Sequence, residues 1–174
     1  MARSLRLAAT VVVAVAALAI PTAASAAPAS TSFTITGFEY AFTQTVGFFA
    51  GSGTGNAGDR AAWNTSVEHD PLGSDPTFVN GGSFQMATQS PTARLDFVTG
   101  TFVNHEGTIT TKDPGDGCTN QRFLVTGTLA DVATSTTAGG TGAFSVTLTH
   151  FRTSLFGRCV TYFASVAGKV SFEY

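Results

Sequence analysis

The chain has 174 residues, a formal net charge of −2 at pH 7 and only 11 % charged residues. It contains no cluster of basic side chains, so we do not expect nucleic acid among its partners. Lysine and glutamate, which favour the surfaces of helices, are scarce, and the composition therefore argues against a helical protein.

The first 26 residues are typical of a secretory signal peptide. Arg3 and Arg6 provide a positive start, residues 7–20 form an unbroken apolar run of 14 residues, and the small residues "ASA" end at Ala26. A membrane-spanning helix needs about 20 apolar residues, so this run is too short to cross a bilayer. We therefore expect cleavage after Ala26, secretion of the mature chain, and no membrane insertion of that chain.

The mature chain, residues 27–174, has the size of a single domain. It carries seven basic and eleven acidic side chains, which gives a net charge of −4, and it contains 26 threonines and all 15 phenylalanines. Threonine and phenylalanine favour the half-buried surface of a pleated sheet. This composition predicts an all-β domain.

Apolar and polar side chains alternate along the chain with a period of two, which is typical of strands. In "AFSVTLTHF", residues 143–151, one face carries Phe144, Val146, Leu148 and His150. The pattern predicts strands, in chain order, at 31–37, 38–49, 60–69, 81–88, 93–99, 101–111, 119–130, 142–153 and 159–173. Turn-forming residues separate most of them, in "GSGTGNAGD", "DPLGSDP", "SPT", "DPGDG" and "TSTTAGGTG".

A run of sequential strands leaves two sheet edges exposed unless the sheet closes on itself. Closure into a barrel removes both edges, and the short turns favour it. Gly107, Gly127 and Gly168 lie within predicted strands and suit the sharp bends of a small barrel. We therefore predict a single antiparallel up-and-down β-barrel of about eight strands, with a two-layer β-sandwich as the alternative.

Three glycine-containing motifs lie at the starts of strands or within them: "GTF" at 100–102, "GTI" at 107–109 and "GTGAFSVTL" at 140–148. Most of the mature chain resembles small exported barrels of the calycin and allene-oxide-cyclase-barrel kind. The resemblance rests on these motifs, the strand spacing and the short turns. The resemblance implies a barrel fold. It assigns no catalytic residue, because none of these motifs is specific to an activity.

Cys118 and Cys159 are the only cysteines. An even number of cysteines in an exported chain suggests pairing in an oxidising environment. We predict a disulfide that joins the turn "DPGDGC" to the start of the last strand. The alternative is a reactive Cys159 thiol beside His150, brought together by a hairpin at "TSLFGR", which would leave Cys118 without a role.

The stretch "HFRTSLFGRCVTY", residues 150–162, holds the densest group of chemically active side chains. His150 continues the apolar row of one strand, and Tyr162 continues that of the last strand. We predict His150, Arg152 and Tyr162 as ligand-binding residues and no catalytic residue. Arg152 and Arg158 are interpreted as solvated charges at strand ends, with an anion clamp at a barrel mouth as the alternative.

His69, His105 and His150 each extend an apolar row, so three inward-facing imidazoles could bind zinc. The three residues have none of the local spacings of a metal site. We therefore interpret them as histidines at the solvated ends of strands and expect neither a metal nor another cofactor.

The sequence leaves three functions open. The first is a secreted, non-enzymatic barrel that binds a small apolar molecule, with the phenylalanines either lining a cavity or simply filling the core. The second is a cyclase or isomerase that acts in the barrel cavity through His150, Arg152 and Tyr162. The third is a cell-surface interaction protein that uses its threonine-rich outer face.

Overall fold

The computed structural model describes residues 30–90 and 95–174. The predicted signal peptide, its cleavage site and part of the predicted turn "SPT" therefore lie outside the described residues. Within the described ranges, no helix is long and apolar enough to span a membrane. The strands are β1 Ser30–Phe42, β2 Val46–Gly55, β3 Arg60–His69, β4 Thr77–Gln89, β5 Leu95–Phe102, β6 Gly107–Asp113, β7 Gln121–Ala133, β8 Gly140–Leu155 and β9 Arg158–Glu173.

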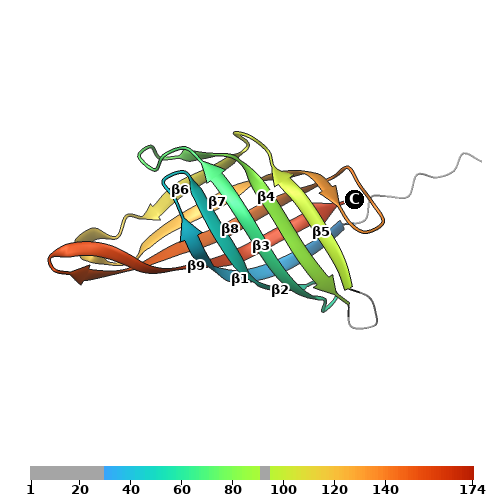
Figure 1. Cartoon of the computed structure of the whole chain (residues 1–174), viewed down its shortest axis with the longest axis horizontal. Coiled ribbons are helices and arrows are strands. Elements are labelled where there is room, and N and C mark those ends of the chain that lie inside the picture. The colour runs from blue at the N-terminus through green and yellow to red at the C-terminus, as the bar shows by residue number, and fades with distance from the viewer. Residues whose placement is uncertain (1–29, 91–94) are drawn as a thin grey trace, which may run out of the picture.

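All nine strands belong to one antiparallel sheet, which closes into a barrel (Figure 1). Around the ring the order is β3-β2-β1-β9-β8-β7-β5-β4, and pairing between β3 and β4 completes it. β6 shares one position of the ring with β5, because both strands pair with β4 and with β7. The structure is thus a closed eight-strand barrel with one extra strand, which confirms the predicted barrel and excludes the sandwich.

The shared position arises from a break where the sequence predicts one continuous strand, 101–111. β5 and β6 are separated by residues 103–106, and this part of the prediction is wrong. His105 has a positive φ of 62° and its backbone N–H donates to the carbonyl of Val79 at 2.8 Å. This hydrogen bond holds the segment between β5 and β6, residues 103–106, against β4 in the barrel wall.

The first hairpin also differs from the prediction. The sequence predicts strands at 31–37 and 38–49, with a break after Gly37 and another at Gly51, whereas β1 runs to Phe42 and β2 runs through Gly51 to Gly55. The turn is made by Thr43, whose hydroxyl oxygen accepts hydrogen bonds from the backbone N–H groups of residues 45 and 46. Such a threonine turn carries a weaker sequence signal than glycine or proline.

Two of these glycines serve packing inside the barrel. Trp63 on β3 is 4 % exposed, and its indole N–H donates to the carbonyl of Ser52 at 3.0 Å. A Cβ atom at Gly37 would lie 2.5 Å from the indole ring, and one at Gly51 would lie 2.0 Å from a backbone oxygen of β1. Gly37 therefore leaves room for the only tryptophan of the chain, and Gly51 allows the close approach of β2 to the backbone of β1.

The end of the barrel where β1 begins and β9 ends is filled with side chains. Phe172 is fully buried, and its ring packs against Phe33 at 6.3 Å and Phe84 at 5.6 Å between ring centroids. At the same end, the hydroxyl of Tyr174 donates to Thr31 at 3.3 Å. This end is the apolar core of the protein.

At the opposite end, β8 and β9 extend past their neighbours as a hairpin, residues 151–163, which we call the arm (Figure 1). Cys118, in the short 3-10 turn Asp116–Cys118, forms a disulfide with Cys159 of the arm. The predicted pairing is confirmed, and because both cysteines are bonded, the alternative of a reactive thiol is wrong. The bond ties the arm to the β6–β7 loop.

Removing the disulfide should lower the stability of the protein. The bond closes a loop between positions separated by 41 residues. For the double variant Cys118→Ala/Cys159→Ala, we expect the free energy of unfolding to fall by up to about 4 kcal/mol, because the unfolded chain regains the entropy of that loop. Urea unfolding followed by the fluorescence of Trp63 measures this change, and an unchanged midpoint would contradict it.

Gly168 of β9 provides a second test of the packing. A Cβ atom there would lie 2.2 Å from the carbonyl oxygen of Ser145 on β8, so Gly168→Ala must push two paired strands apart. We expect a loss of about 1–3 kcal/mol in the free energy of unfolding. The control is Gly73→Ala, where the nearest atom would lie 4.0 Å away. Equal midpoints for the two variants in urea would refute the packing argument.

Candidate functional site

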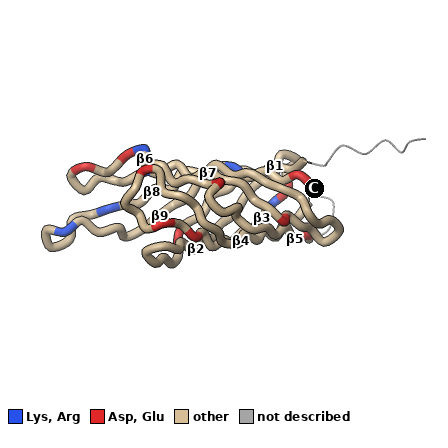
Figure 2. Tube along the Cα trace, turned by 90° about the horizontal axis from the view of Figure 1, so that it is seen from above, with Lys and Arg blue, Asp and Glu red and all other residues tan. Residues whose placement is uncertain are grey.

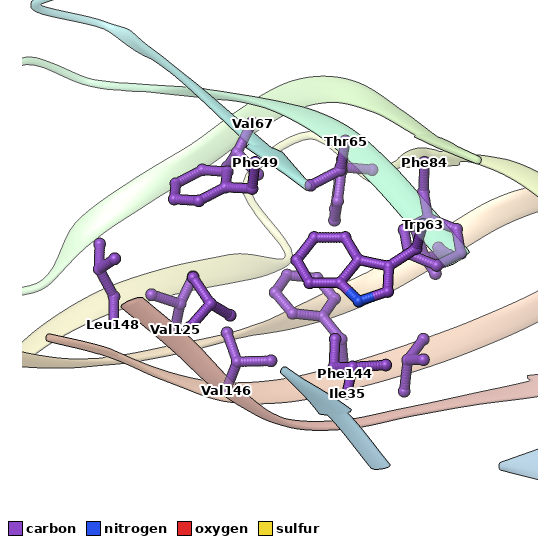
Figure 3. Close-up of a pocket in the computed structure, with 14 residues that line it drawn as sticks. Ile35, Phe49, Trp63, Thr65, Val67, Phe84, Val125, Phe144, Val146 and Leu148 are labelled. Carbon is purple, nitrogen blue, oxygen red and sulfur yellow. The ribbon is translucent and has the colours of Figure 1, made fainter. Parts of the chain in front are cut away.

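The barrel is hollow toward the end that carries the arm. A small inner cavity of about 60 Å³ lies beside Trp63, and an outer cavity of about 710 Å³, which we call the cup, opens at the mouth. Figure 3 shows the inner cavity, with side chains from opposite walls pointing toward one another. The two cavities share four lining residues, Phe49, Val67, Val125 and Leu148.

Apolar side chains make up most of the wall of the cup. The phenylalanines on this wall support the expectation that some of them line a cavity instead of only filling the core. The apolar lining residues are Phe42, Phe49, Val67, Pro71, Leu72, Ile109, Phe123, Val125 and Leu148, and the polar ones are Glu39, Thr43, Gln44, His69, His150 and Thr161.

Glu39 and His150 form the most buried polar pair of the cup. Glu39 lies on the inward face of β1 and His150 on the inward face of β8, and their side chains are 12 % and 17 % exposed. Glu39 Oε2 lies 3.6 Å from His150 Nε2, which is too far for a direct hydrogen bond. His150 Nε2 is buried and has no hydrogen-bond partner among the described residues.

Burial shifts the pKa values of Glu39 and His150 in opposite directions. Loss of solvation raises the pKa of the Glu39 carboxyl to about 7. The same effect, together with the positive charge of Arg152, lowers the pKa of His150 below its usual value of 6.5. At neutral pH the imidazole is therefore uncharged, and the carboxyl is poised between its neutral and ionised forms. Such a pair can exchange a proton with a bound molecule.

His69 supplies a second imidazole at the wall. Its Nδ1 lies 2.7 Å from the carbonyl oxygen of Asp70. Because a carbonyl oxygen only accepts hydrogen bonds, Nδ1 carries the proton, and in the neutral ring Nε2 is then an acceptor. In this tautomer, the nitrogen of His69 that remains unpaired with Asp70 is an acceptor.

Of the three predicted ligand-binding residues, His150 lies in the cup and Arg152 does not line it. The guanidinium of Arg152 donates to the carbonyl of Gly115 at 3.1 Å and to that of Pro114 at 3.4 Å. Its backbone N–H donates to the side-chain oxygen of Asn120 at 3.3 Å. Arg152 thus fastens the β6–β7 loop to the arm instead of being one of two solvated charges, and neither it nor Arg158 lines the cup as an anion clamp.

Tyr162 is 66 % exposed and also lies outside the lining of the cup. Phe151 pairs with Phe163, whereas Arg152 pairs with Thr161, so Tyr162 is the extra residue of a β-bulge. A bulge reverses the alternation of faces beyond it. Thr161 consequently takes the inward position that the sequence pattern assigns to Tyr162. The structure therefore does not bring the three predicted residues together.

Glu39 is the cup residue that the sequence interpretation missed. Its signal is present in the chain: Phe33, Ile35 and Gly37 precede it at intervals of two, and the first two are buried. A carboxyl that continues a buried row of a strand must face the interior. Assigning a strand break after Gly37 hid this continuity.

The three histidines do not gather at one point. His69 and His150 line the cup, whereas the ring of His105 stacks on the half-exposed Phe78 on another part of the wall, 5.4 Å between centroids. Among residues 30–90 and 95–174, no group of three or more histidine, cysteine, aspartate or glutamate side chains is placed to hold a metal ion. The hypothetical three-histidine zinc site is therefore not formed.

Comparison with known proteins gives no relative of this chain. No family model matches it, and neither does any curated protein or solved structure. The resemblance to calycin and allene-oxide-cyclase-type barrels accordingly stays a prediction, and the site has to be interpreted from its own chemistry.

The raised pKa of Glu39 predicts a characteristic dependence of stability on pH. The unfolded chain releases this proton near pH 4.5, and the folded protein releases it near pH 7. The stabilisation is therefore complete below pH 4.5 and is lost as the pH rises through 7. Relative to Glu39→Gln, the wild-type protein should lose up to about 3 kcal/mol over this range.

Urea unfolding of both proteins at several pH values between 4 and 8 measures this difference. The lowered pKa of His150 acts in the opposite sense, because its contribution grows as the pH rises toward 6.5, but His150 is present in both proteins. The comparison therefore isolates Glu39. A difference in stability that does not change with pH would show that the carboxyl is not buried in the way described.

Proposed function

We propose that the protein binds a small, mainly apolar molecule in the cup. The observation that carries the proposal is the cavity itself, about 710 Å³ in volume, with an apolar wall and a few converging polar groups. Ligand sites of proteins typically have volumes of about 300–1,000 Å³ and this kind of lining.

The rim supports the same proposal. Phe42 is 72 % exposed and Leu72 is 56 % exposed, although both line the cup. Large apolar side chains left in water at the edge of an apolar cavity gain burial when a ligand covers them. Phe49 and Leu148 extend the apolar lining from the cup to the smaller inner cavity.

We further propose that binding takes place outside the cell. The disulfide between Cys118 and Cys159 is the kind of bond that persists in oxidising compartments. The signal-like segment of residues 1–26 leads to the same expectation from the sequence.

A cyclase or isomerase is the second candidate, and the Glu39–His150 pair favours it. A buried carboxyl and a neutral imidazole with oppositely shifted pKa values are suited to acid–base chemistry on a bound molecule. This candidate keeps His150 of its predicted residues and replaces Arg152 and Tyr162 with Glu39. The third candidate, interaction through the outer face, gains no support comparable to the cup.

The proposed function is tested by narrowing the cup. Thr161→Tyr places a ring at the mouth, so we expect it to weaken binding of Nile red, an uncharged apolar dye, by about tenfold, equivalent to roughly 1.4 kcal/mol. The matched control is Thr147→Tyr, on the exposed outer face of β8. Fluorescence titration measures both affinities, and absence of dye binding to the wild-type protein, or equal affinity of the two variants, would refute the proposal.

A further inference from the structure

The charged groups of the cup have one sign. Among the described residues that line it, there is one carboxyl group, that of Glu39, and neither a lysine nor an arginine. In Figure 2, the basic residues lie on the arm and at a few separate positions along the tube, without forming a cluster. A ligand that reaches Glu39 and His150 therefore meets a carboxyl group that is negatively charged when it is ionised.

From this arrangement we infer that the cup binds an apolar amine, as its ammonium ion, with the nitrogen held between Glu39 and His150. The inference rests on the proposed function and specifies the class of ligand. It disfavours fatty acids and other apolar carboxylates, because none of the described residues that line the cup is a lysine or arginine that could form an ion pair with them.

The geometry of the pair suits an ammonium group. Glu39 Oε2 and His150 Nε2 lie 3.6 Å apart, so one nitrogen can lie within hydrogen-bond distance of both. An ammonium group carries three N–H donors and no acceptor. It can therefore supply the hydrogen bond that the buried His150 Nε2 lacks and balance the charge of Glu39 at the same time.

The remaining charged and titratable groups near the pair offer no direct partner to a bound anion, although the positive charge of Arg152 acts on His150. His69 uses Nδ1 to donate to the carbonyl of Asp70 and leaves its other ring nitrogen as an acceptor. Arg152 is the nearest arginine in sequence to His150, and its guanidinium is held by the carbonyls of residues 114 and 115, away from the lining.

The binding equilibrium should depend on pH through Glu39. An ammonium ion interacts more strongly with the ionised carboxyl than with the neutral one. Because the pKa of Glu39 is about 7, affinity should be full at pH 8 and fall as the pH is lowered. A primary amine stays protonated over this range, as lysine does with a pKa of about 10.4.

Three probes with one apolar ring separate the alternatives: 2-naphthylmethylamine, 2-naphthylmethanol and 2-naphthoate. Isothermal titration calorimetry at pH 8 should give an affinity for the amine at least about tenfold higher than for the alcohol, and no detectable binding of the carboxylate. Between pH 8 and pH 6, the affinity for the amine should fall roughly tenfold while that for the alcohol stays constant.

Two glutamate variants complete the experiment. Glu39→Gln should abolish the preference for the amine, whereas Glu68→Gln, which changes an exposed carboxyl on β3, should leave it intact. If Glu39→Gln does not fold, the change in the amine affinity of the wild-type protein between pH 8 and pH 6 tests the inference by itself.

The outcomes distinguish the two proposals. If the alcohol and the amine bind equally, or if the carboxylate binds best, the inference of an amine is overturned and the apolar cup stands. If none of the three probes binds the wild-type protein, and Nile red does not bind either, both proposals fail.

Discussion

The closure of the sheet by the ladder between β1 and β9 is the constraint on which the other features depend. Ser30 pairs with Glu173, so the two ends of the described domain meet across a single hydrogen-bonded seam. Once the sheet is closed, every second side chain has to point inward, and the sequence determines only which side chains those are. Phe172 and Trp63 fill one part of the interior, and smaller or more distant side chains leave the other part hollow.

The cup therefore results from the unfilled interior at one end of the barrel and from the arm, which extends the wall at that end. Its wall includes Thr161 at the base of the arm, and the arm is held to the β6–β7 loop by the Cys118–Cys159 bond and by Arg152. Of the stretch 150–162, which looked most chemically active in the sequence, only His150 and Thr161 line the cup, whereas Arg152 and Cys159 hold the arm in place. The buried polar groups of the cup come from two distant strands, at Glu39 and His150.

Strict alternation allowed the barrel and the inward position of His150 to be predicted from the sequence, and the even number of cysteines in an exported chain allowed the disulfide to be predicted. The prediction failed where a backbone irregularity changed the alternation. Tyr162 faces outward because it occupies a bulge, and a bulge leaves no residue signature of its own. Glu39 was missed because a strand was predicted to end at Gly37, although this glycine lies within β1 and makes space for Trp63. That contact depends on the closed structure and cannot be recognised from local sequence.

The two ends of the barrel differ in one more respect. Tyr174 lies beside Thr31 at the filled end, and Figure 1 shows the carboxyl terminus at the end of the barrel opposite the arm. The cup opens at the end that carries the arm. A linker joined to the carboxyl terminus would therefore leave the opening free. A sensor chip that captures the protein through a tag at this terminus would present every molecule with its mouth toward the flowing solution.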